Sequence, residues 1–274
     1  MKERTFNHWQ IAKDTYAIQC PGYIKGPGEL SGWGYVITYL LIGSERALLQ
    51  DTGFGNADLK GYVERLTEKP LVVVNSHVHP DHSGGNRQFG EILILEEERE
   101  TEEPVYFEQE GEKERCESVN SCKDYRFCRV PAGTVLHLGD REVELLRLEG
   151  HTKGSMILFD RKTKLVFSGD AILKRCLLLA GLPLSAYRAA LVRLQKHGGY
   201  EDIWGAHWYQ PLGKNHVERV LALIDSYDPE KVEIAAWDES GGDRMVITRC
   251  GNAFEERDFT AIGIPESCRE DMLR

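Results

Sequence analysis

The 274-residue chain is long enough to bury a large core, and 41% of its residues are hydrophobic. Its formal net charge of −10 opposes general binding to nucleic-acid phosphates, so we expect no nucleic-acid partner. No apolar run reaches the roughly eighteen residues needed to span a bilayer, and the first eight residues are too polar for a secretory signal. We therefore expect no membrane partner and a cytoplasmic location.

The seven cysteines are odd in number and include no CxxC pair, which argues against a disulfide framework and against a thiolate zinc site. This usage fits a reducing cytoplasm. Cys116, Cys122 and Cys128 are spaced by six within a charged segment, and we interpret them as reduced thiols.

In the first half of the chain, β-branched and aliphatic residues predict strands at 33–42 and 46–50 around a turn at Gly43. Asn56 is suited to cap a helix that runs to about residue 67. Apolar strands of buried type are expected at 71–75 and 92–95.

A charged insertion is expected at about 96–130, a segment that contains twelve Asp or Glu and six Lys or Arg. One interpretation is a solvated helix and loop. The other is a lid or a dimer element that turns Tyr106, Phe107, Tyr125 and Phe127 inward, which leaves a homodimer open.

The second half alternates short strands and helices. The order suggests two similar β/α halves packed sheet against sheet with helices outside, in one domain over residues 1–274. The expected strands are 134–138, 142–148, 155–160, 164–168, 202–206, 231–236 and 245–249, and the helices cover 184–197 and about 217–224.

Four potential metal ligands crowd into six residues, His77-Val78-His79-Pro80-Asp81-His82, directly after the apolar strand at 71–75. Buried together without a metal, three imidazoles and a carboxylate would cost desolvation, and they would repel when protonated. The stretch therefore predicts a transition-metal site. Its spacing allows one turn to supply ligands to two adjacent metals.

Three further candidate ligands each follow a predicted strand and stand beside a glycine or in a glycine-containing turn. A ligand at a strand end projects from a rigid element, and glycine allows close approach of the backbone. These residues are His151, Asp170 and His207.

Together with Asp51-Thr52-Gly53, these motifs resemble the metallo-β-lactamase-fold superfamily of metal-dependent hydrolases across nearly the whole chain. The resemblance implies an α+β fold, the four-layer αββα sandwich. It implies that Asp51 orders the metal-binding loop without being a ligand. It also implies that His77, His79 and His151 bind one metal, that Asp81, His82 and His207 bind a second, and that Asp170 bridges both.

By the same resemblance, the cofactors are two divalent metal ions, with zinc favoured and iron or manganese as alternatives. A hydroxide between the metals attacks a carbonyl or phosphoryl centre. As a catalytic role, we interpret Asp81 as helping to move the proton to the leaving group.

Departures from known branches narrow the choice within the superfamily. Common zinc β-lactamases carry Cys at the position of Asp170, flavodiiron proteins usually carry Glu at His79, and homoserine lactonases carry Tyr at Leu173. The pattern favours the glyoxalase II-like group, with a small-molecule ester, thioester or lactone as substrate. The alternatives are a mononuclear iron persulfide dioxygenase-like enzyme, a phosphodiesterase of the same fold and a non-catalytic binding protein. Trp33, Trp208 and Tyr209 are candidate pocket residues.

Overall fold

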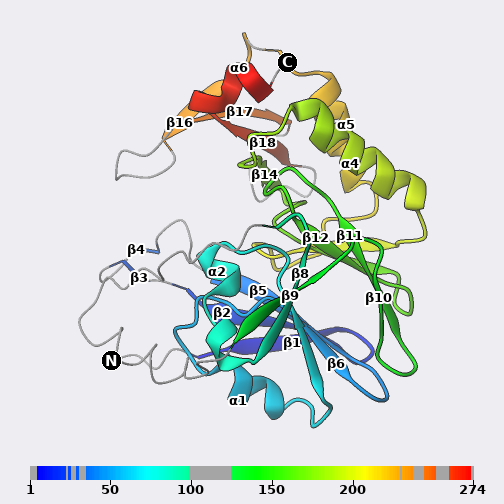
Figure 1. The fold of residues 1–274 in the computed structure, drawn as a ribbon. Coiled ribbons are helices and arrows are strands. Elements are labelled where there is room, and N and C mark those ends of the chain that lie inside the picture. Colours follow the sequence, from blue (N-terminus) through cyan, green and yellow to red (C-terminus); the bar gives the residue numbers. More distant parts are fainter. Residues whose placement is uncertain are drawn as a thin grey trace. The chain divides into compact units, whose positions relative to one another are not determined.

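The computed structural model describes residues 5–22, 24–25, 29–30, 35–98, 125–228, 230–236, 244–250 and 259–272. The chain divides into two compact units, residues 1–145 with 160–163 and residues 146–159 with 164–274 (Figure 1). A single domain over the whole chain remains our prediction. Trp33, Cys116, Cys122, Tyr106, Phe107 and most of the charged insertion lie outside the described residues.

The first unit is built on a seven-stranded sheet. Neighbouring strands pair antiparallel from β1 through β2 and β5 to β6, and parallel from β6 through β7 and β8 to β9. The parallel part brings the C-terminal ends of β6, β7 and β8 to one edge. The strands of this sheet are β1 (Asn7–Ala12), β2 (Thr15–Pro21), β5 (Tyr35–Ile42), β6 (Ala47–Gln50), β7 (Leu71–Val74), β8 (Glu91–Leu95) and β9 (Arg126–Val130). Strands β3 (Ile24–Lys25) and β4 (Glu29–Leu30) form a separate antiparallel pair, and β10 (Val135–His137) pairs antiparallel with β11 (Glu142–Arg147) at the edge of another sheet.

The helices of this unit are short: α1 (Leu59–Glu64), α2 (Pro80–Ser83) and the 3-10 turn η1 (Asn86–Gln88). The predicted start of the first helix was wrong. Asp58 caps α1 by accepting a hydrogen bond from the Gly61 amide, whereas the side chain of Asn56 donates to the Pro21 carbonyl. The parallel connection between β6 and β7 thus runs through one short helix.

A buried ion pair joins distant parts of the first unit. The Arg141 guanidinium donates from Nε and Nη2 to both carboxylate oxygens of Asp160, at 3.0 and 2.6 Å. It also donates to the Asp14 carbonyl at 2.9 Å and to Thr15 Oγ1 at 2.7 Å. Both charged side chains have no exposed surface, so this network replaces the hydration that they lose on folding.

In the second unit, β13 and β15 pair in parallel, and a separate sheet has the order β14-β18-β17-β16. Helices α4 and α5 supply much of the apolar core, through residues such as Leu191, Leu194, Val217 and Val220. The elements are β12 (Met156–Asp160), β13 (Leu165–Gly169), β14 (Arg175–Leu177), α4 (Leu184–His197), β15 (Asp202–Gly205), α5 (His216–Asp225), β16 (Glu233–Ala236), β17 (Arg244–Cys250), β18 (Thr260–Pro265), η2 (Glu266–Cys268) and α6 (Arg269–Met272).

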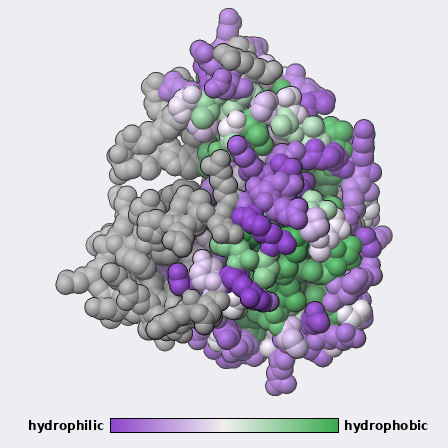
Figure 2. Space-filling model, viewed as in Figure 1, coloured by the Kyte–Doolittle hydropathy of each residue, from purple (hydrophilic) through white to green (hydrophobic). Residues whose placement is uncertain are grey.

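Hydrophobic residues reach part of the face drawn in Figure 2, with hydrophilic residues around them. Among the described large hydrophobic side chains, only Tyr209 is exposed. None of the helices in the described ranges is both long and apolar enough to cross a membrane.

Candidate functional site

The histidine-rich turn lies at the C-terminal end of β7, within the parallel part of the first sheet. His77 follows the strand by three residues, and His79 immediately precedes α2. Pro80 occupies the first turn of α2, where its missing N–H costs nothing, and Asp81 and His82 lie within that helix. The short helix thus presents the last two candidate ligands, both buried.

Asp51, at the end of neighbouring β6, orients this turn. One carboxylate oxygen accepts the Ser76 amide at 2.7 Å, and the other accepts the Ser76 hydroxyl and His82 Nδ1, each at 2.8 Å. Because an ionised carboxylate can only accept, His82 carries its proton on Nδ1, which leaves the lone pair on Nε2. Asp51 adopts a φ of 66°, an uncommon conformation that these three contacts stabilise.

The backbone of the turn is fixed by a buried polar network beneath it. The His82 carbonyl accepts hydrogen bonds from the Thr52 amide at 2.7 Å and from Asn75 Nδ2 at 3.1 Å. Asn86 Nδ2 donates to Asn75 Oδ1, and Asn86 Oδ1 accepts from the Thr52 hydroxyl, each at 2.8 Å. Neither Asn75 nor Asn86 was identified from the sequence, although they flank the histidine-rich turn and are only eleven residues apart.

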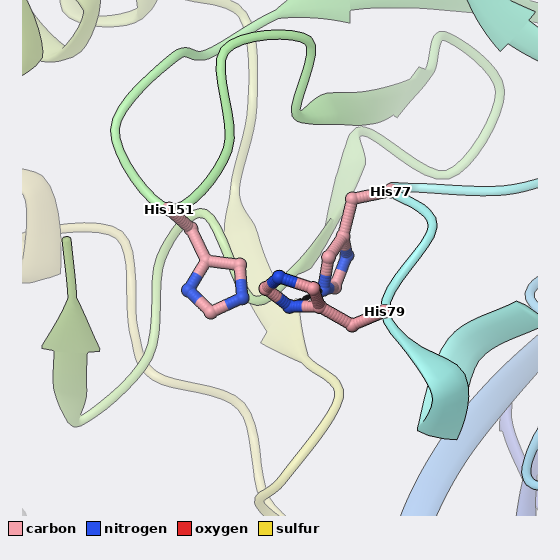
Figure 3. Close-up of side chains that lie close together, drawn as sticks. All are labelled: His77, His79 and His151. Carbon is pink, nitrogen blue, oxygen red and sulfur yellow. Dashed lines mark hydrogen bonds between the residues drawn. The ribbon is translucent and has the colours of Figure 1, made fainter. Parts of the chain in front are cut away.

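The first two histidines of the turn face each other. His77 Nε2 lies 2.9 Å from His79 Nδ1, the contact drawn as a dashed line in Figure 3. The Ser76 hydroxyl donates its proton to Asp51, so it accepts from His77 Nδ1 at 3.1 Å. Asp81 Oδ2 lies 3.4 Å from His82 Nε2. The first unit therefore brings together four of the predicted ligands in two close pairs.

The second unit brings together the other three. Asp170 follows β13 and His207 follows β15, and these two strands are parallel neighbours. Asp170 Oδ2 lies 3.3 Å from His207 Nε2 and 3.7 Å from His151 Nε2. His151, also labelled in Figure 3, donates from Nδ1 to the Leu177 carbonyl at 2.7 Å, which leaves the Nε2 lone pair toward Asp170.

The segment after Asp170 is held by four buried donors, one for each of its next four carbonyl oxygens. Tyr187 Oη bonds the Ala171 carbonyl at 2.9 Å, Ser168 Oγ bonds Ile172 at 2.7 Å, His216 Nε2 bonds Leu173 at 2.9 Å, and the Ala261 amide bonds Lys174 at 2.8 Å. This role of Tyr187 and His216 was not predicted from the sequence. Burial lowers the pKa of His216 to about 4, so it is neutral at pH 7.

The structure also places the remaining residues that the sequence singled out. Trp208 follows His207, and its ring lies 3.8 Å from the Lys174 ammonium nitrogen, a cation–π contact. Leu173, the position that distinguishes homoserine lactonases, is buried. Of the three cysteines spaced by six, the described one, Cys128, lies on β9. Burial raises the pKa of the Cys20 thiol to about 12. Among the described residues, five cysteines are free of disulfides.

The two clusters of histidine and aspartate are candidate metal-binding groups, as in a metal-dependent hydrolase, and similarity to known proteins identifies the family. A family model described as the metallo-beta-lactamase superfamily matches residues 31–199. The chain belongs to this superfamily of metallo-hydrolases, and the predicted enzyme class is confirmed.

Among curated relatives, the chain is 31% identical to human acyl-coenzyme A thioesterase MBLAC2 over 232 residues, which cover 76% of this chain and 75% of that protein. It is 30% identical to the probable metallo-hydrolase YqgX of Bacillus subtilis (strain 168), over 49% of this chain and 64% of that protein.

Among solved structures, a metallo-beta-lactamase from Pontibacter korlensis aligns with a TM-score of 0.59 and 18% identity, over 81% of this chain and all of that one. A metallo-beta-lactamase family protein of Thermus thermophilus aligns with a TM-score of 0.57 and 20% identity, over 78% of this chain and 80% of that one. These likenesses confirm the predicted α+β sandwich fold.

Proposed function

We propose that this protein is a metal-dependent thioesterase that hydrolyses the thioester of an acyl-coenzyme A or a similar small molecule. The observation that carries the proposal is the 31% identity to human acyl-coenzyme A thioesterase MBLAC2 across three quarters of both chains. The absence of Cys at position 170 and of Tyr at position 173 supports a thioester over a β-lactam or a homoserine lactone.

In this proposal, the candidate ligands of both units serve two divalent metal ions. Their candidate sets are His77, His79 and His151, and Asp81, His82, Asp170 and His207. Asp170 would serve both ions.

The donor chemistry supports a fit to such ions. The Nδ1 atoms of His82 and His151 are engaged by Asp51 and the Leu177 carbonyl, so the Nε2 atoms of both rings offer lone pairs. Imidazole and carboxylate donors suit zinc, which we favour, and also iron or manganese.

When bound, the metal ions would lower the pKa of a coordinated water and stabilise negative charge on the carbonyl oxygen. Water oxygen bonds to the acyl carbon, the carbon–sulfur bond breaks, and the products are a carboxylate, a thiol and one proton released to solvent. Asp81, buried beside His82, takes the water proton and passes it to the departing sulfur.

The first test is elemental analysis of the purified protein, followed by a panel of thioester, ester, lactone, phosphodiester and β-lactam substrates. We expect about two metal ions per chain and stoichiometric thiol release from acyl-coenzyme A. Asp170→Ala should lose both metal and activity. One iron per chain with oxygen consumption would instead indicate the dioxygenase-like enzyme, and preferred hydrolysis of a phosphodiester would indicate the phosphodiesterase.

The proton role of Asp81 has its own test. Asp81→Asn keeps a donor oxygen but cannot take up a proton at neutral pH, so turnover should fall more than metal content. Equal losses in turnover and metal content would refute the separate proton role.

A further inference from the structure

Tyr187 lies where three segments of the second unit meet. It extends from α4, a fourteen-residue helix whose buried face packs in the apolar core, and its side chain is 1% exposed. Its neighbours are the segment ending at Gly150, the segment starting at Asp170 and strand β14. The first segment leads directly into His151, the second begins with Asp170, and Leu177 of β14 accepts a hydrogen bond from His151.

The ring of Tyr187 lies directly against Gly150, the residue before His151. A Cβ added at Gly150 would lie 2.4 Å from Cδ2 of this ring, and the glycine has a φ of 154°. Only glycine therefore fits here, and the ring determines how closely the backbone preceding His151 approaches α4.

The hydroxyl of the same side chain fixes the other ligand segment. It donates to the Ala171 carbonyl at 2.9 Å, directly after Asp170. The Cys176 thiol is a further hydrogen-bond partner of Tyr187, and the next residue, Leu177, accepts the Nδ1 proton of His151. One rigid side chain thus contacts the backbone beside both His151 and Asp170.

We propose that Tyr187 is a positioning residue that sets the spacing between His151 and Asp170, and so the affinity for the metal that these two residues share. The ring restrains His151 through Gly150, and the hydroxyl restrains Asp170 through Ala171. This inference rests on the proposed metal-binding roles of His151 and Asp170.

The test compares Tyr187→Phe with Tyr200→Phe. Both variants remove one phenol oxygen from a buried tyrosine of the same core, and phenylalanine keeps the ring against Gly150. Metal affinity is measured by competing Zn²⁺ against a chromophoric chelator, without substrate. We expect Tyr187→Phe to weaken the binding of one zinc ion by on the order of tenfold and Tyr200→Phe to change it less than twofold.

Amide hydrogen exchange provides a second readout in the metal-free protein. Tyr187→Phe should speed exchange at Asp170 and Ala171, and turnover should fall while KM for the thioester stays within about twofold of its original value. A third variant, Cys176→Ala, keeps the bond to Ala171 and should keep the zinc affinity, which assigns the effect to that bond.

Equal zinc affinities for Tyr187→Phe and Tyr200→Phe would overturn the positioning role, even if both variants melt at lower temperature. An Asp170→Ala protein that keeps both metal ions would instead refute the proposed function. Loss of metal in Asp170→Ala with unchanged affinity in Tyr187→Phe would refute the role of Tyr187 alone.

Discussion

Replacing Asp51 by Asn should reverse the proton position on His82. Asparagine has the same shape and tolerates the φ of 66° found at this position. Its amide oxygen must face the Ser76 amide, which donates at 2.7 Å, so its NH₂ group faces His82 Nδ1. His82 Nδ1 then has to accept, and the ring proton moves to Nε2 and blocks the lone pair that a metal needs.

The magnitude follows from the bond that is lost. A hydrogen bond to a buried carboxylate contributes about 1.5–3 kcal/mol, which corresponds to a roughly 10- to 100-fold loss in affinity for one metal ion. Zinc competition gives the affinity, and nitrogen NMR of His82 in the metal-free protein reports the ring proton. Asp58→Asn is the matched control, because asparagine caps α1 as well as aspartate does. An unchanged ring proton together with full zinc affinity would refute this account of Asp51.

Two further predictions concern stability. Burial lowers the pKa of His216 from 6.5 to about 4. The contribution of the neutral side chain to the free energy of unfolding is therefore complete above pH 6.5 and is lost as the pH falls toward 4. This amounts to about 3 kcal/mol between pH 7 and 4, and His216→Gln should remove that dependence in urea unfolding. Arg141→Met leaves the Asp160 charge buried and should cost about 3–5 kcal/mol, whereas Arg161→Met at an exposed pair should cost far less. An Arg141→Met protein as stable as the Arg161→Met control would contradict the buried-pair account.

Much of the fold could be predicted because its apolar strands are short, uninterrupted and bounded by turn residues. The buried strand at 71–75 and the helix at 184–197 correspond closely to β7 and α4. Strands β1 and β2 were not predicted; in β1 the alternation is limited to Trp9 and Ile11, and half of its residues are exposed. Strand β14 is three residues long, too short for a periodic pattern.

The candidate ligands could be found because each follows a strand and belongs to a residue type that metals prefer. Their supporting residues could not. Tyr187 reads as an ordinary core position of an amphipathic helix, and His216 as a solitary histidine. Both act on carbonyl oxygens of residues 171 and 173, which only the folded chain brings to them. A hydrogen bond to a distant backbone carbonyl leaves no local pattern in a sequence.

The central claim is that two metal ions bound by these clusters support thioester hydrolysis. Its most direct test is the rate of thiol release from acyl-coenzyme A as metal-free protein is titrated with Zn²⁺. We expect the rate to rise until about two equivalents per chain are bound and then to stay constant. A constant rate from one equivalent onward would contradict the dinuclear centre, and no thiol release at any zinc level would contradict the thioesterase.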